Sequence, residues 1–128
     1  MIVRRYNAKH DYERLKAMYA SWGHPEACPQ PEELPLTGFI VDDTAAMFMY
    51  MTDSRLCSFE NAITVRGSPG HTEAIHKLVD RCMEEAKRLH FTKVFIYVGN
   101  EFALKRALAT GFTLDAEPQR WQLSREVK

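Results

Sequence analysis

The segment Arg66–Thr72 carries the residues whose types and spacing best suit ligand chemistry. It lies between a strand-like run and an amphipathic helical pattern, so its last residues should begin a helix. A helix N-terminus offers unpaired backbone N–H groups and a favourable dipole to an anion such as phosphate. Gly67 and Gly70 permit close backbone approach and positive φ, while Arg66 and His71 add side-chain donors. The segment could therefore hold a phosphate group; the alternative is an ordinary strand-to-helix turn.

Metal chemistry is not expected from the histidines and cysteines. The five histidines are scattered, and His71 and His76 fall on different faces of a helix because they are five residues apart. The three cysteines, Cys28, Cys57 and Cys82, show neither the paired spacing of a zinc site nor the density of a secreted, disulfide-rich domain. Reduced thiols in a cytoplasmic protein fit this pattern best.

The composition bounds the size of the fold and the class of partner. With 128 residues and 45% hydrophobic side chains, the chain can close one substantial core, so a single domain over residues 1–128 is expected. Seventeen basic and 17 acidic side chains leave no net charge to gather nucleic acid or acidic membrane. No apolar run approaches the ~20 residues of a membrane span, and the amino-terminal residues do not resemble a signal peptide. The expected partner is a small molecule or a protein.

Strands dominate the first half of the expected order of elements. Ile2–Tyr6 is short and β-prone, and apolar residues then recur at helical spacing from Leu15 to Trp22. Prolines make His24–Pro35 a loop with at most one helical turn. Three strand-like runs follow, separated by tight turns and therefore expected to pair antiparallel: Leu36–Val41, Ala45–Met51 and Leu56–Val65.

Helical periodicity returns after the glycine-containing segment. Apolar residues from Ile75 to Leu89 line one face of a helix, and Pro69 suits its start because the missing N–H would be unpaired there anyway. Val94–Val98 predicts a strand covered on both faces, and the preceding helix makes it a parallel partner of Leu56–Val65. A shorter helix and two closing strands complete the order: Asn100–Thr110, Phe112–Glu117 and Arg120–Arg125.

This order of elements resembles the GNAT superfamily of acyl-CoA-dependent N-acyltransferases over nearly the whole chain. Asn100 and Ala103, followed by Gly111 and Phe112, match the family's Asn-x-x-Ala…Gly-Phe signature at its usual spacing. The same residues would also serve as caps of a short helix, and both interpretations can hold together. The resemblance implies an α/β (α+β) fold: a mixed, mostly antiparallel sheet of about seven strands, with strands 4 and 5 parallel, flanked by helices.

The resemblance also implies a slot for acetyl-coenzyme A (acetyl-CoA). In the family, strands 4 and 5 splay apart to bind the pantetheine arm, and an Arg/Gln-x-x-Gly-x-Gly/Ala loop binds the pyrophosphate. Arg66 fits the first loop position, but Pro69 and His71 occupy the two positions that are normally small, so weaker coenzyme binding is expected. The implied cofactor-binding residues are Ile63, Thr64, Val65, Arg66, Gly67, Ser68, Gly70, His71, Thr72 and Asn100.

The implied catalytic base is Glu60, because many family members use a glutamate of the fourth strand directly or through water. A base is needed to take the proton of the attacking amine. Strand alternation would place Glu60 on one face together with Ser58, Ala62 and Thr64. The alternative is that Glu60 is a solvent-facing residue of an open sheet.

The implied proton donor for the departing thiolate is missing. The family's tyrosine falls on Ala107, which has no proton to give. Tyr97, Tyr50 or water could substitute, and the alternative for both tyrosines is packing as ordinary strand aromatics.

The expected function is transfer of acetyl from acetyl-CoA to an amine of a small molecule or protein, with homodimer formation left open. The acidic residues Glu26, Glu32 and Glu33 lie where the family builds its acceptor pocket, which is compatible with a cationic amine; the commoner alternative is that they belong to a solvated loop. Ala107 and the altered pyrophosphate loop support the alternative, a non-catalytic GNAT-fold interaction protein. The segment from Tyr97 onward also resembles compact GNAT-like phage proteins, including virion components. A wholly antiparallel sheet would instead favour an unrelated ligand-binding module.

Overall fold

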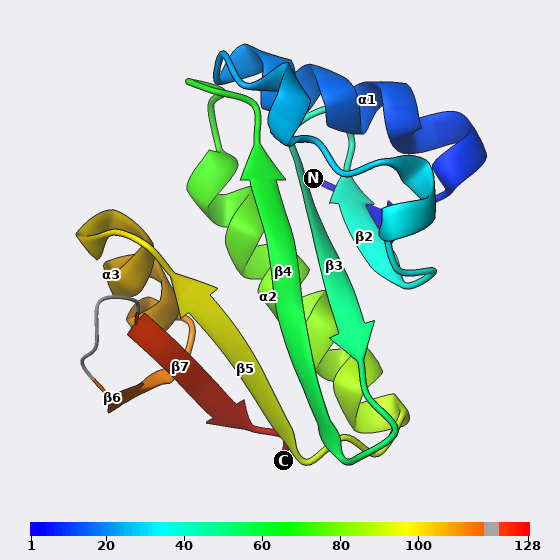
Figure 1. Ribbon diagram of the computed structural model, residues 1–128. Helices are drawn as coiled ribbons and strands as arrows, with labels where there is room; N and C mark the ends of the chain where they lie inside the picture. The colour runs from blue at the N-terminus through cyan, green and yellow to red at the C-terminus, as the bar shows by residue number, and fades with distance from the viewer. Residues whose placement is uncertain (117–120) are drawn as a thin grey trace.

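The computed structural model describes residues 1–116 and 121–128 of the chain. Its elements alternate as the sequence predicts, beginning with strand, helix and three successive strands (Figure 1). In chain order they are β1 (Val3–Arg5), α1 (Ala8–Ser21), the 3₁₀ helices η1 (Pro25–Ala27) and η2 (Pro31–Glu33), β2 (Gly38–Val41), β3 (Ala45–Met51), β4 (Leu56–Thr64), α2 (His71–Arg88), β5 (Lys93–Val98), α3 (Glu101–Ala109), β6 (Thr113–Ala116) and β7 (Trp121–Glu126).

The seven strands form one mixed sheet in the order β1-β2-β3-β4-β5-β7-β6. Every neighbouring pair is antiparallel except β4 and β5, which are parallel. The predicted α/β fold with a single parallel pair is therefore confirmed. The parallel pair arises because α2 returns the chain to the starting end of the sheet, as a strand–helix–strand crossover requires.

Two hydrophobic clusters cover the two faces of the sheet. On one face, the buried side of α2 packs with β3, β4 and β5, and includes Ile75, Leu78 and Cys82. On the other face, Leu15 and Met18 of α1 are fully buried against the sheet. Helix α3 joins the α2 side, where its Ala107 is buried. The sheet thus lies between α1 with the 3₁₀ turns and the pair α2 and α3.

A buried carboxylate fastens α2 to the first strand. Glu85 is only 2% exposed, and its Oε2 lies 2.6 Å from Nη2 of Arg5 and 2.5 Å from Nη2 of Arg88. These hydrogen bonds, Arg88 first, outweigh the cost of burial and hold the pKa of Glu85 down at about 2. Asp11 of α1 is fully buried in a similar way, since Arg4 donates two hydrogen bonds to it and lowers its pKa. Both helices are therefore fixed to the sheet by charge pairing as well as by apolar packing.

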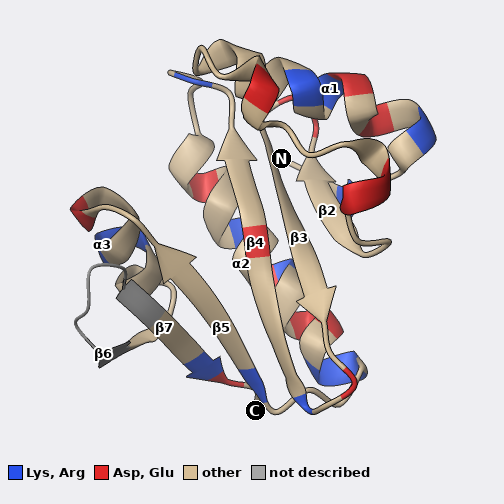
Figure 2. Cartoon of the chain, viewed as in Figure 1, with Lys and Arg blue, Asp and Glu red and all other residues tan. Residues whose placement is uncertain are grey.

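Element boundaries differ from the sequence predictions by a few residues. The predicted loop His24–Pro35 contains two 3₁₀ turns rather than one helical turn, because Pro25 and Pro31 each begin one. The ends of the two predicted closing strands around Pro118 lie outside the described residues. Within the described ranges, none of the helices has the length and apolar character that crossing a membrane would require. Figure 2 shows acidic and basic positions interspersed along α1 and α2.

Candidate functional site

The candidate site is a cleft that opens where β4 and β5 stop pairing. The parallel ladder joins only Leu56–Ser58 to Lys93–Phe95. Beyond these residues, β4 continues against β3 and β5 continues against β7, but the described residues of β4 and β5 no longer pair with each other. The two strands diverge visibly from their shared lower end in Figure 1. Each strand thus presents backbone to the opening between them.

A β-bulge at Asn61 shapes the β4 side of the cleft. Glu60 lies opposite Phe48, whereas Ile63 lies opposite Ala46, so β4 has one extra residue over this stretch. Asn61 accommodates the extra residue with a left-handed backbone, φ 54°, a conformation that asparagine tolerates better than most residues. Its side-chain amide donates a hydrogen bond to the hydroxyl of Tyr50, which holds the bulge in place.

The bulge reverses the alternation of side chains along β4. Before it, Phe59 packs in the α2-side cluster and Glu60 faces the opposite side. After it, Ile63 packs in the α1-side cluster, and Ala62 and Thr64 line a cavity near α2. The prediction that Glu60 shares a face with Ala62 and Thr64 is therefore wrong, because regular strand alternation does not continue through a bulge. Glu60 does share its face with Ser58, whose hydroxyl donates a 3.0 Å hydrogen bond to it.

The cleft contains two adjoining cavities. The first, about 370 Å³, lies between β4, β5 and α3, and the second, about 410 Å³, extends from β4 to the loop before α2. Ala62, Ile75, Ala103 and Arg106 line both cavities, so the two lie side by side. Together they extend from the divergence of the strands to the Arg66–Thr72 segment.

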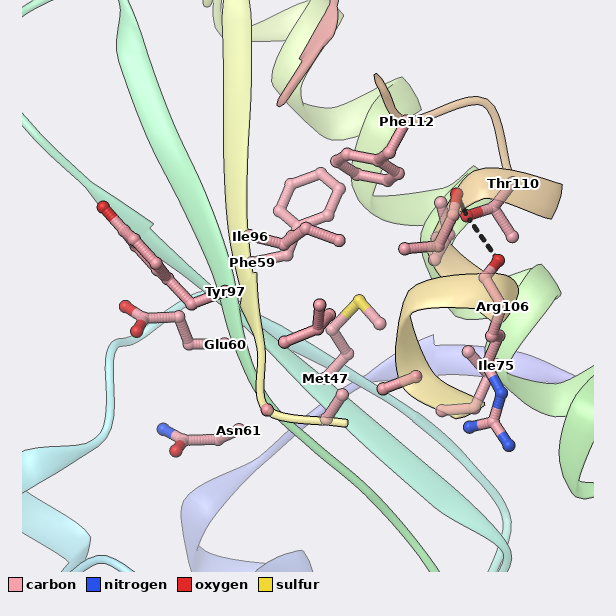
Figure 3. Close-up of a pocket in the computed structure, with 16 residues that line it drawn as sticks. Met47, Phe59, Glu60, Asn61, Ile75, Ile96, Tyr97, Arg106, Thr110 and Phe112 are labelled. Carbon is pink, nitrogen blue, oxygen red and sulfur yellow. Dashed lines mark hydrogen bonds between the residues drawn. The ribbon is translucent and has the colours of Figure 1, made fainter. Parts of the chain in front are cut away.

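The candidate catalytic residues Glu60 and Tyr97 lie on the same side of this opening. Both side chains line the first cavity, and Figure 3 shows them pointing away from Phe59, Ile96 and Phe112. Glu60 is exposed, and Tyr97 is 53% exposed. The structure therefore brings the two together at the α1-side mouth of the cleft, where an acceptor could approach.

Some backbone amides in and beside the Arg66–Thr72 segment already donate hydrogen bonds, and others are free. The bonded amides are those of Val65 to the carbonyl of Thr44, Arg66 to Oγ of Ser21, and Ser68 to the carbonyl of Val65. The amides of Gly67 and Gly70 have no partner among the described residues. The first three amides of α2 also lack a partner there, as at any helix start; they belong to His71, Thr72 and Glu73. Five donors therefore remain, and Pro69 supplies none.

Left-handed glycines and an orphan hydroxyl complete this loop. Gly67 and Gly70 have φ of 72° and 75°, which explains why glycine stands at both positions. The Oγ of Ser68 is buried and has no hydrogen-bond partner within the described structure. His71 Nδ1 lies 3.0 Å from the carbonyl oxygen of Ser68, so Nδ1 carries the proton and donates it there.

The β4 backbone also presents groups to the opening. The amide of Val65 points to β3, and backbone groups alternate in direction along a strand, so those of Thr64 and Ala62 point to the cleft. The carbonyl of Thr64 accepts a 2.6 Å hydrogen bond from the indole of Trp22. The guanidinium of Arg66 lies over the same indole, 5.7 Å from the ring centroid. Trp22, at the end of α1, therefore forms a wall of the second cavity.

Helix α3 closes the other wall. Asn100 caps it, with Oδ1 accepting a 2.8 Å hydrogen bond from the amide of Ala103. Ala107 lines the first cavity as a buried methyl group and offers no proton. Phe112 packs edge-on against Phe59 at 6.4 Å between ring centroids. The predicted signature residues therefore position the helix along the cleft.

Tyr50 lies beside the cleft without lining either cavity. Burial, above all, raises the pKa of its phenol, with Glu60 and Glu33 adding to the effect and Asn61 opposing it. The phenol therefore stays protonated at neutral pH. Since its oxygen accepts the bond from Asn61, its own proton remains available to donate.

The groups for metal or thiol chemistry do not gather at the cleft. Among the described residues, no cluster of three or more histidine, cysteine, aspartate or glutamate side chains is arranged to hold a metal ion. Cys28, Cys57 and Cys82 are buried and form no disulfide within the described structure. Burial raises the pKa of the Cys57 thiol to about 11, so this thiol is not poised as a nucleophile.

Several solved structures that share this fold are described as acetyltransferases. The chain superposes on aminoglycoside 6'-acetyltransferase type Ii with a TM-score of 0.81 at 11% identity, covering 100% of this chain and 98% of that one. It matches Rv2747 from Mycobacterium tuberculosis, solved in complex with CoA and NLQ, with a TM-score of 0.79 at 12% identity and full coverage of both chains. It matches IAA acetyltransferase from Bacillus cereus with a TM-score of 0.73 at 12% identity, covering 98% of each chain. No family model and no curated protein matches the sequence. The chain thus has the fold of the GNAT acetyltransferases.

Proposed function

We propose that this chain is an acyl-CoA-dependent N-acyltransferase that binds coenzyme A in the cleft between β4 and β5 and transfers acetyl to an amine. The observation that carries the proposal is that β4 and β5 diverge beyond their short ladder and lead to a loop and helix start where five backbone amides have no partner among the described residues. A sheet without a ligand in that gap would gain hydrogen bonds by zipping β4 and β5 together. The likeness to a CoA-bound structure of the same fold supports this use of the cleft.

The residues present fit the parts of coenzyme A in order along the cleft. The free amides of Gly67, Gly70 and the first turn of α2 suit the negatively charged diphosphate. The outward-facing backbone of Ala62 and Thr64 suits the amides of the pantetheine arm. The mostly apolar first cavity suits the end of that arm.

Glu60 is the group best placed to accept a proton from an acceptor amine. When bound, acetyl-CoA supplies an acetyl group activated as a thioester. Glu60 is exposed at the mouth of the first cavity on the side away from α2, where it can take up a proton directly or through water. Tyr97 lies on the same side and lines the first cavity, so its phenol can return a proton to the leaving group. Glu60 and the acidic residues of η2 favour a cationic amine as acceptor.

Two measurements test the proposal. Isothermal titration calorimetry with coenzyme A should show saturable binding at a single site. Thiol release from acetyl-CoA should then rise when primary amines, including aminoglycosides and lysine peptides, are added. Absence of coenzyme binding would reject the proposal.

One observation favours a second candidate, a GNAT-fold protein that binds the coenzyme without catalysis. Ala107 faces the first cavity where a proton donor would be needed. For this candidate, calorimetry would show coenzyme binding, but no amine in the panel would increase thiol release.

A further inference from the structure

Arg106 has an unusual position for a charged residue of α3. Its side chain lines both cavities, and about two thirds of α3's length separates it from the capping residue Asn100. Its guanidinium stacks over the ring of Phe102, one turn earlier, at 4.8 Å from the ring centroid. In Figure 3 it extends away from Glu60 and Tyr97. The charge is thus held at the α2-side part of the cleft.

The guanidinium of Arg106 lacks an anionic partner within the described structure. Five other arginines form ion pairs with carboxylates: Arg4, Arg5, Arg14, Arg81 and Arg88. Arg106 forms no ion pair and donates no side-chain hydrogen bond to a described residue, and its partial burial lowers its pKa. Because a guanidinium keeps its proton at any physiological pH, a partly buried one without a counter-charge is costly. Such an arrangement suits an anion that arrives from outside the chain.

The surroundings of Arg106 indicate which anion. The second cavity is lined by Gly67 and His71 on its loop side and by Arg106 on its α3 side. Among the described residues lining this cavity there is no carboxylate to compete for the guanidinium. An anion seated on the free amides of the loop would therefore meet the planar, multidentate donor set of Arg106 from across the cleft.

We propose that Arg106 binds the diphosphate of coenzyme A from the α3 side and so supplies donors that Pro69, lacking an N–H, cannot give. This inference rests on the proposed function, since it assigns a residue to the same coenzyme site. Phe102 holds the guanidinium in place by stacking, which makes Phe102 a positioning residue and Arg106 a direct ligand.

The test compares three ligands and three proteins by calorimetry. The ligands are coenzyme A, dephospho-coenzyme A, which keeps the diphosphate but lacks the 3′-phosphate, and pantetheine, which has no phosphate. The proteins are the unaltered chain, R106Q and the control K105Q, which removes one positive charge from an exposed neighbour on the same helix. R106Q should weaken binding of both phosphorylated ligands by about 10- to 100-fold, as expected for hydrogen bonds to a charged group. Pantetheine binding by R106Q should differ from that of the unaltered chain by less than about twofold. K105Q should bind all three ligands within about twofold of the unaltered chain.

Each other outcome overturns the inference in a distinct way. Equal weakening of pantetheine would assign Arg106 a structural role. Weakening for coenzyme A alone would place Arg106 on the 3′-phosphate. Unchanged binding by R106Q, with the unaltered chain binding normally, would reject this inference but leave the proposed function standing. Failure of the unaltered chain to bind any of the three ligands would reject both. Far-UV circular dichroism and urea unfolding of R106Q establish that the variant is folded, and R106K should recover part of the lost affinity.

Discussion

Glu85→Gln provides a quantitative test of how α2 is fixed to the sheet. The carboxylate is 2% exposed and is bonded to Arg5 and Arg88. Its pKa falls from the ordinary 4.5 to about 2, and at about 1.4 kcal/mol per pKa unit this gives an upper limit of about 3.5 kcal/mol. Both arginine side chains are more than half exposed, so solvent screening should reduce the contribution to about 1–2 kcal/mol.

The sign of the pH dependence follows from the lowered pKa. The contribution of Glu85 is fully present above pH 4.5 and is lost as the pH falls from there toward 2. In urea unfolding at pH 6, Glu85→Gln should be less stable than the unaltered chain by about 1–2 kcal/mol. Between pH 6 and pH 3, the variant should lose less of its free energy of unfolding than the unaltered chain does. Asp11, whose pKa is also lowered, should leave some acid sensitivity in the variant.

The control for this experiment is Glu84→Gln, an exposed neighbour on the same helix. It should match the unaltered chain to within about 0.5 kcal/mol at both pH values. A Glu85→Gln variant as stable as this control at pH 6, or one with undiminished pH dependence, would refute the reasoning.

Three further predictions concern the cleft. Glu60→Gln should lower kcat for acetyl transfer by about 100-fold while the Kd for coenzyme A stays within about twofold, and an unchanged kcat would exclude Glu60 as the base. Ala107→Tyr should place a phenol in the first cavity and raise kcat above that of the matched Ala107→Phe variant; equal rates would show that no proton is delivered from this position. Gly67→Ala should cost about 1 kcal/mol in urea unfolding because its φ is 72°, although nothing lies within 4 Å of the added methyl group, and an unaffected stability would contradict the claim of backbone strain.

Local sequence signals were sufficient to predict the order of elements. Strand and helix periods differ, so the change of period after Gly70 marks the start of α2, and the apolar run Val94–Val98 marks a buried strand. Short turns such as the one at Asp42, which has φ 44°, require neighbouring strands to pair antiparallel. These signals depend only on residues close together in the chain.

The shape of the cleft could not be predicted in the same way. The bulge at Asn61 exists because β4 has one residue more than β3 over the paired stretch, which depends on the register between two strands. The one local signal of a bulge was the asparagine within this strand-like run, since asparagine is uncommon in strands and tolerates positive φ. Regular strand alternation, which takes no account of the bulge, therefore placed Ala62 and Thr64 on the wrong face of β4.

The sequence could not show which donors are free in the cleft, because this depends on contacts between residues far apart in the chain. The amides of Val65 and Arg66 are taken by Thr44 and Ser21, residues far away in the sequence. Helical spacing alone did not single out Arg106, because the cavities that it lines are formed jointly by β4, α2 and α3. The assignments of Glu60, Tyr97 and the loop residues to catalysis and coenzyme binding remain predictions.

The most direct test of the coenzyme cleft is an amide-resolved ¹H–¹⁵N NMR titration with coenzyme A. We expect saturable shifts at Ala62, Thr64, Gly67 and Gly70, while amides near Arg88 at the far end of α2 stay unchanged. Shifts scattered over the surface, or none at millimolar coenzyme, would contradict the claim that the diverging strands bind it.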